Sequence, residues 1–395
     1  MPPILTRKCQ LYMQKLQANI PVSLYVHLPW CVQKCPYCDF NSHQLKDNLP
    51  EALYVQALLD ELAMQCHWLQ NRPLASIFFG GGTPSLFSGK AIGKILEGAA
   101  QFTPFAPDIE ITLEANPGTI DHAHFQDYRT AGVNRISLGV QSLDNQKLKA
   151  LGRIHDSVQV HKAIATAKRV GFDNFNIDIM YGLPQQSLAE AMSDINIALS
   201  FEPTHFSWYQ LTLEPNTLFY RAPPPLPCDD LLWDMQVAGQ SILQTAGMQQ
   251  YEVSAYALHA KACKHNLNYW EFGDYLGIGA GAHSKITDIN SQKIFRFAQV
   301  KHPKDYLNAE KRRGIQTNLI SESDVVFEFM LNALRLKNGV RVELFEQRTG
   351  LCREKLETVL QIGSEKGWLH VGDEKIGVTE LGERYLNDVV ALFLN

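Results

Sequence analysis

Residues 24–40 read Leu-Tyr-Val-His-Leu-Pro-Trp-Cys-Val-Gln-Lys-Cys-Pro-Tyr-Cys-Asp-Phe, and this stretch organises the rest of the 395-residue chain. The apolar run at 23–28 predicts a strand that Pro29 ends. Three cysteines follow, Cys31, Cys35 and Cys38, with the spacing Cys-x3-Cys-x2-Cys. Such closely spaced thiolates can face one point. A [4Fe–4S] cluster held by them would keep one iron without a protein ligand, because these clusters otherwise take four thiolates. That iron is free to bind and activate a small molecule.

Three other interpretations of these cysteines stay open. A disulfide framework suits small secreted chains, whereas this chain is long and we expect no signal peptide. A structural zinc site takes four ligands, and His27 or His43 would complete one. The third interpretation is a chance gathering of cysteines in one loop.

The motif resembles the signature of radical S-adenosylmethionine (SAM) proteins, with Tyr37 as the aromatic residue before the last cysteine. In that family the open iron chelates the amino and carboxylate groups of SAM. An electron from the cluster then cleaves SAM to methionine and a 5′-deoxyadenosyl radical. The flanking segments at 25–31 and 38–43 are similar to the oxygen-independent coproporphyrinogen III oxidase branch, which contains haem chaperones beside the oxidase.

Composition describes an ordinary globular protein. Hydrophobic residues make up 45% of the chain and charged residues 19%, and the net charge of -5 offers no general basis for binding nucleic acid. No apolar run approaches the ~20 residues of a membrane span. Eight cysteines suit a reducing compartment, so we expect a cytoplasmic protein.

Strands and helices are predicted to alternate along most of the chain. The predicted strands are 23–28, 76–79, 109–113, 135–140, 174–180, 205–213 and 275–283; the predicted helices are 49–69, 89–102, 121–131, 157–170, 188–200 and 229–246. This alternation indicates an α/β fold with a parallel sheet. Together with the resemblance, it implies a partial (β/α)6 TIM-like radical SAM barrel.

Polar residues recur where the predicted strands end, at Gly81, Glu114, Gln141 and Asp178. In a βα barrel the loops after neighbouring strands converge on one face, where catalytic groups lie. Each residue alone could equally cap a helix or fill a turn. Four such positions in consecutive units favour a site.

The resemblance assigns roles to these positions. It implies SAM contacts by Tyr25, by the loop Gly81, Gly82 and Thr83, and by Glu114; ribose contacts by Gln141 and Asp178; and pairing of Arg153 with the SAM carboxylate. Arginine suits that role because its planar fork meets a carboxylate through two hydrogen bonds.

Residues 265–270 have the form His-Asn-x-x-Tyr-Trp, which resembles a motif associated with haem binding in the chaperones of this branch. An imidazole such as that of His265 can ligate haem iron, and Tyr269 and Trp270 offer flat apolar surface beside it. The alternative is a helix end with buried aromatic residues and a hydrogen-bonded histidine.

The alternation stops near residue 301. We expect an N-terminal extension at 1–22, the barrel domain at 23–290, a linker at 291–321 and a C-terminal domain at 322–395. Helices at 325–335, 342–349, 353–366 and 381–393 with a hairpin at 368–378 suggest a small winged-helix-like α+β domain. From Glu322 on, acidic residues outnumber basic ones thirteen to nine, which disfavours DNA binding and indicates a lid or docking domain.

Two functions follow from the resemblance. One is a haem chaperone that passes haem to acceptor proteins, with the [4Fe–4S] cluster and SAM in support; the other is the oxidase, which decarboxylates coproporphyrinogen III. The oxidase has a further cysteine two residues after the motif, where this chain has Phe40, so the chaperone is preferred. The resemblance also implies an electron donor such as flavodoxin or ferredoxin, and membrane association only through acceptors.

Overall fold

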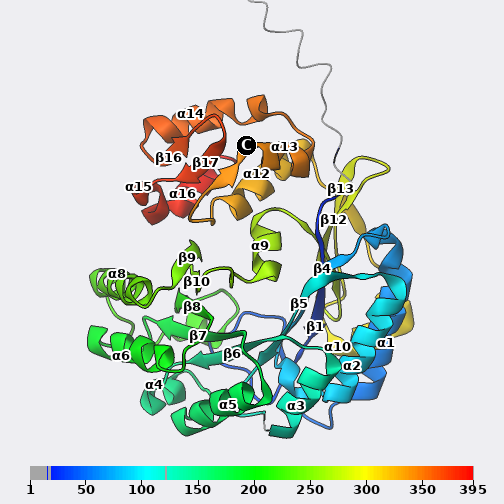
Figure 1. Ribbon diagram of the computed structural model, residues 1–395, viewed down its shortest axis with the longest axis vertical. Helices are drawn as coiled ribbons and strands as arrows, with labels where there is room; N and C mark the ends of the chain where they lie inside the picture. The colour runs from blue at the N-terminus through cyan, green and yellow to red at the C-terminus, as the bar shows by residue number, and fades with distance from the viewer. Residues whose placement is uncertain (1–15, 17–18, 121, 395) are drawn as a thin grey trace, which may run out of the picture.

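The computed structural model describes residues 16, 19–120 and 122–394, and one large sheet dominates it (Figure 1). Twelve strands join in the order β14-β13-β12-β11-β1-β4-β5-β6-β7-β8-β10-β9. The middle of this sheet is parallel and both edges are antiparallel. The expected α/β class is confirmed.

The parallel strands form the predicted partial barrel. They are β11 (Asp274–Ile278), β1 (Val22–Leu28), β4 (Leu74–Gly81), β5 (Phe105–Ala115), β6 (Arg135–Gln141), β7 (Phe175–Tyr181) and β8 (His205–Gln210). The main covering helices are α1 (Glu51–Gln65), α2 (Gly89–Phe102), α3 (His122–Ala131), α5 (Ser157–Val170), α6 (Leu188–Leu199) and α8 (Asp229–Thr245), with the short α4 (Asn145–Ala150) and α7 (Leu218–Arg221) in loops. Strands such as β1 and β7 are buried along almost their whole length, as expected for a parallel sheet covered on both faces.

Local signals fix where several helices begin and end. The Ser88 hydroxyl accepts a hydrogen bond from the Ala91 N–H at the start of α2, and Asp156 and Ser187 form capping boxes at α5 and α6. Gly171, at φ 90°, ends α5 in the left-handed conformation that glycine adopts at little cost. These caps set the loop lengths that bring strand ends to one face.

One edge of the sheet differs from expectation. The predicted strand at 275–283 is two strands, β11 and the antiparallel β12 (His283–Asp288), because the chain reverses through Gly279 and Gly281 at positive φ. Residues 291–321, expected to be a linker, carry β13 (Lys293–Ala298) and β14 (Thr317–Leu319), which extend the sheet.

The helices of this segment, α10 (Pro303–Leu307) and α11 (Ala309–Arg313), are tied to the barrel through one buried carboxylate. Glu61 of α1 accepts hydrogen bonds from the Tyr306 hydroxyl at 2.6 Å, from the Gly279 N–H at 2.9 Å and from the Gln299 amide at 3.0 Å. Burial raises the pKa of Glu61, while these donors act in the opposite direction. The segment is therefore integrated with the sheet.

At the opposite edge, β9 (Gln249–Glu252) and β10 (Ala255–Ala257) form an antiparallel pair that was not predicted. The predicted strand at 205–213 ends three residues early as β8. α9 (Lys264–Trp270), which carries the His-Asn-x-x-Tyr-Trp motif, follows this edge and lies between the barrel strands and the C-terminal helices (Figure 1).

The C-terminal unit has the expected mixture of helices and a hairpin. It contains α12 (Glu322–Ala333), β15 (Val340–Arg341), α13 (Val342–Thr349), α14 (Glu357–Glu365), β16 (Leu369–Val371), β17 (Lys375–Val378), α15 (Glu380–Arg384) and α16 (Leu386–Ala391). β15 joins the predicted hairpin in a three-stranded sheet, and the predicted last helix is divided at Tyr385. Its core also takes in Phe272 and Ile294 from the barrel side.

Most of the expected N-terminal extension at 1–22 lies outside the described residues. Across the part of the chain that the structure describes, no helix combines the length and apolar character needed to cross a membrane.

Candidate functional site

The cysteine loop directly follows β1, and backbone hydrogen bonds hold its two ends together. β2 (Trp30–Cys31) and β3 (His43–Gln44) pair in parallel at the base of the loop. Within the loop, the Lys34 ammonium donates to the carbonyl oxygens of Phe40 and Ser42, each at 3.1 Å. The loop therefore has a defined shape that presents its sulfur atoms on one side.

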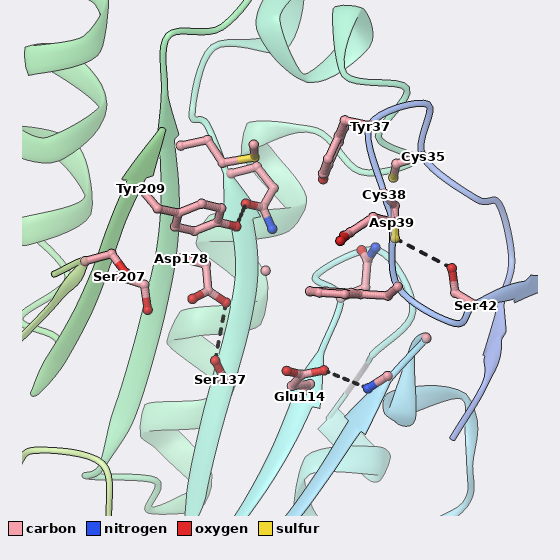
Figure 2. A pocket seen from close by; sticks show the side chains of 18 of the residues that line it. Cys35, Tyr37, Cys38, Asp39, Ser42, Glu114, Ser137, Asp178, Ser207 and Tyr209 are labelled. Atoms are coloured by element: carbon pink, nitrogen blue, oxygen red, sulfur yellow. Dashed lines mark hydrogen bonds between the residues drawn. The ribbon is translucent and has the colours of Figure 1, made fainter. Parts of the chain in front are cut away.

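The three thiols lie in the wall of one cavity of about 420 Å³. Cys35 Sγ is 3.7 Å from Arg153 Nη1. Cys38 Sγ is 3.6 Å from the Ser42 hydroxyl (Figure 2). Burial raises the pKa of Cys31, and the negative charge of Cys38 and Cys35 raises it further. Bound iron ions would reduce the repulsion between these thiolates.

This donor set fits an iron–sulfur cluster by its chemistry. Cys31, Cys35 and Cys38 are free thiols, and all three share the cavity. Within the described ranges, no three His, Cys, Asp or Glu side chains stand close enough together to hold a single metal ion.

The glycine loop at the end of β4 packs directly on the cysteine loop. The Thr83 N–H donates to the Trp30 carbonyl at 2.8 Å. A Cβ on Gly82 would lie 2.6 Å from the Trp30 carbonyl oxygen, and one on Gly81 would lie 2.5 Å from the His27 ring. Glycine is needed at both positions because of these close approaches.

Two half-buried carboxylates, Glu114 of β5 and Asp178 of β7, face the same cavity (Figure 2). Glu114, near the end of β5, accepts a hydrogen bond from the Gly81 N–H at 3.2 Å. Burial and the charge of Asp178 raise the pKa of Glu114 to about 8. Burial also raises the pKa of Asp178, which accepts hydrogen bonds from Asn176 at 2.8 Å and Ser137 at 3.3 Å. Such a pair favours a cationic ligand, which would stabilise both carboxylates.

Gln141 and Arg153 complete this part of the wall. Gln141 sits at φ 71°, and its side-chain carbonyl accepts a hydrogen bond from the Tyr209 hydroxyl at 2.6 Å. Arg153 Nη2 donates to the Gly139 carbonyl at 2.6 Å, and its Nε is buried without a hydrogen-bond partner among the described residues. An unsatisfied guanidinium N–H in a cavity wall is suited to an anionic acceptor.

The structure brings most of the predicted site residues together. Those that line the 420 Å³ cavity are Cys31, Cys35, Tyr37, Cys38, Gly81, Gly82, Thr83, Glu114, Gln141, Arg153 and Asp178. Tyr25 lines an adjoining cavity that shares Gly81 and Glu114, and its hydroxyl lies 3.0 Å from His27 Nδ1.

His265 lies apart from this cavity wall. Its side chain is 2% exposed, its Nδ1 is 3.0 Å from the Ser76 hydroxyl, and its ring stacks on Phe78 at 4.8 Å between centroids. Burial lowers the pKa of His265 to about 3, and the charge of Arg135 acts in the same direction. Its Nε2 is buried without a hydrogen-bond partner in the described part of the chain. In this conformation that nitrogen is not accessible to a ligand from outside the protein.

Sequence reasoning missed several residues of the cavity. Ser137, Ser207 and Tyr209 point into it beside Asp178 (Figure 2). Ser137 and Ser207 lie inside strands, where only the inward-facing side of a barrel strand distinguishes them. Arg335 also lines the cavity, although it follows α12 in the C-terminal unit, and no motif marked it.

Comparison with known proteins agrees with this geometry. Residues 25–196 match the Radical SAM superfamily, and residues 320–383 match the HemN C-terminal domain. The chain is 48% identical to the haem chaperone HemW of Escherichia coli, over 95% of this chain and 98% of that protein. It is 32% identical to HemW of Bacillus subtilis, over 94% and 99% of the two chains.

Among solved structures, coproporphyrinogen III oxidase (HemN) of Escherichia coli, described as a radical SAM enzyme, is similar with a TM-score of 0.80. The match has 21% sequence identity and covers 96% of this chain and 91% of the oxidase. At that identity the similarity concerns the fold, which the barrel and the C-terminal unit share with the oxidase.

Proposed function

Because the chain belongs to the HemW family of radical SAM proteins, we propose that it is a haem chaperone, which binds haem and transfers it to acceptor haemoproteins. The observation that carries this proposal is the 48% identity to a haem chaperone over nearly the full length of both chains. Phe40, which is 61% exposed and lines the cavity, supports it, since its side chain has no atom that ligates iron.

The proposal includes a [4Fe–4S] cluster held by Cys31, Cys35 and Cys38. Their shared cavity and free thiols support this assignment. When bound, the cluster supplies an iron with an open position and a source of one electron. A reducing compartment such as the cytoplasm would keep the thiols available.

SAM would bind in the cavity beside the cluster. Glu114 and the backbone of Gly81 to Thr83 would meet its amino group, with Tyr25 and Tyr37 in the surrounding wall. Gln141 and Asp178 would accept hydrogen bonds from the ribose hydroxyls. Arg153 would pair with the carboxylate through its Nε–H, which has no partner among the described residues.

His265 remains our proposed haem ligand within the His-Asn-x-x-Tyr-Trp motif. Because its Nε2 is buried, ligation requires α9 to shift relative to β4 or the C-terminal unit to move away. The neighbouring aromatic side chains Tyr269 and Trp270 would then flank a porphyrin ring. A His265→Ala substitution would also remove the Ser76 hydrogen bond, so haem spectra of this variant need a folding control.

The proposed partners are haem, an acceptor haemoprotein and an electron donor such as flavodoxin or ferredoxin. Any membrane association would arise through a membrane-bound acceptor. We propose no nucleic-acid partner, since acidic residues outnumber basic ones in the chain, 41 to 36.

The test compares the two activities of this branch on one anaerobically reconstituted sample. Titration with haemin should produce a saturable Soret band at about one haem per chain, since a chaperone holds its cargo. The same sample, given coproporphyrinogen III, SAM and a reductant, should form no protoporphyrinogen beyond a protein-free control. Absence of haem binding together with steady formation of protoporphyrinogen would replace the chaperone with the oxidase.

A further inference from the structure

The same cavity also has charged residues on elements that carry none of the residues proposed to contact SAM. Its wall there is made by α9, by β9 and by the segment after α12, through Asn266, Trp270, Glu252 and Arg335. None of the roles assigned above uses Arg335, which is the cationic side chain that the C-terminal unit contributes to the described cavity wall.

Backbone contacts of the two residues that follow Arg335 hold this part of the chain in place. Leu336 forms an isolated antiparallel bridge with Glu252, and the Lys337 N–H donates to the Tyr251 carbonyl at 3.1 Å. The guanidinium carbon lies 4.3 Å from the centre of the Trp270 ring. This stacking orients the planar fork along the aromatic face.

The hydrogen bonding of this stacked pair is incomplete. Arg335 Nη2 donates to Glu252 at 2.9 Å, its one side-chain hydrogen bond to a described residue. Arg335 Nε and Trp270 Nε1 are both buried, and neither has a partner among the residues that the structure describes. Two buried N–H donors without acceptors are costly, and an acceptor-only anion would satisfy them.

Glu252 already shows which anion suits this place. One oxygen of its carboxylate accepts a hydrogen bond from Arg335 Nη2. The other oxygen accepts hydrogen bonds from the Ser254 N–H and hydroxyl, both at 3.2 Å. Glu252 is thus satisfied on both oxygens, whereas Arg335 Nε is buried and has no hydrogen-bond partner among the described residues. A second carboxylate would supply the missing acceptor once a small movement of the Arg335 side chain exposes Nε.

We propose that Arg335 and Trp270 form a carboxylate-binding subsite for a flat, carboxylate-bearing ligand, with Trp270 contacting the ring and Arg335 pairing with a propionate. This inference rests on the proposed haem-chaperone function and names residues that would orient the haem. It makes α12 and the C-terminal unit part of the binding site.

The test uses two probes that differ at the propionates, haemin with free carboxylates and haemin dimethyl ester with neutral, methylated ones. The reconstituted wild-type protein should bind haemin about tenfold or more tightly than the ester, because a charge-assisted pair is lost on esterification. Arg335→Gln should weaken haemin binding by a similar factor and leave ester binding unchanged. Glu252→Gln should tighten haemin binding, since it removes a competing negative charge.

Lys337→Gln is the matched control. Lys337 follows two residues later and pairs with Glu383 at 2.5 Å, and it does not line the cavity, so the preference for haemin should persist. Equal binding of haemin and ester by the wild-type protein would overturn the proposed subsite but not the proposed haem-chaperone function. If neither haemin nor the ester binds, both the haem-chaperone function and the subsite are overturned. Should Arg335→Gln fail to fold, the wild-type comparison and Glu252→Gln still decide.

Discussion

At the scale of single residues, Glu114 shows how the cavity wall changes the acidity of a carboxyl group. It is half-buried near Asp178 and has one backbone donor, the Gly81 N–H. Burial raises its pKa to about 8, so near neutral pH the protonated form prevails in the ligand-free protein. A cationic ligand would restore the carboxylate form, which ties ligand binding to proton release.

The first prediction concerns Glu114→Gln and the pH dependence of stability. The folded-state pKa of about 8 exceeds the ordinary value of 4.5, so the stability that the neutral carboxyl contributes is fully present at low pH. It is lost as pH rises through the folded-state pKa. Urea unfolding of the ligand-free protein between pH 5 and 8 should show wild type losing up to about 1.4 kcal/mol per pH unit relative to Glu114→Gln. Parallel pH profiles of the two proteins would contradict the buried-carboxyl interpretation.

At the scale of elements, the site depends on two loops that pack on each other. The glycine loop after β4 approaches the backbone of the cysteine loop so closely that a single added carbon would meet backbone atoms. Backbone atoms cannot rotate away as a side chain can, so the loop itself would have to move.

The second prediction therefore concerns Gly82→Ala. The added Cβ would lie 2.6 Å from the Trp30 carbonyl oxygen and 2.7 Å from the Pro29 carbonyl carbon. We expect a loss of about 1–3 kcal/mol in the free energy of unfolding and a lower iron content after reconstitution.

The matched control is Gly93→Ala in α2, where the nearest atom to the added Cβ, in Ala131, is 3.7 Å away. Alanine has the higher helix propensity, so this variant should be neutral or gain up to about 1 kcal/mol. Equal effects of the two substitutions, measured by urea unfolding, would show that the loop contact does not matter.

The elements also show what a sequence can and cannot reveal. Gly81, Glu114, Gln141 and Asp178 were predictable because the carboxyl ends of successive parallel strands meet at one face. The strands β9, β10 and β12 to β14 were not, since they are three to six residues long and their pairing partners define them. The place of Arg335 in the cavity wall could not be predicted for a related reason, because its contact with Glu252 joins residues 83 positions apart in the chain.

His265 shows what a motif alone leaves undecided. The motif lies on a short helix with aromatic residues, and tertiary packing places the imidazole against Ser76 and Phe78 inside the barrel. A motif states which residue types occur together, whereas solvent access depends on what packs around them.

At the scale of the whole molecule, one cavity collects side chains from almost the entire length of the chain. Its lining runs from Cys31 through Asp178 to Arg335. The barrel and the C-terminal unit also share a hydrophobic core, to which Phe272 contributes a ring 5.6 Å from Phe329. The two units therefore form one site, and a ligand held there would stabilise both.

The central claim is that Cys31, Cys35 and Cys38 hold one cluster whose remaining iron takes SAM. The most direct measurement is electron paramagnetic resonance of the anaerobically reconstituted, reduced protein, with and without SAM, beside Cys35→Ala and the buried-cysteine control Cys263→Ala. Wild type and Cys263→Ala should give a [4Fe–4S] signal that SAM alters, and Cys35→Ala should give none. A protein that contains zinc or no metal, or a cluster signal that persists in Cys35→Ala and ignores SAM, would contradict the account.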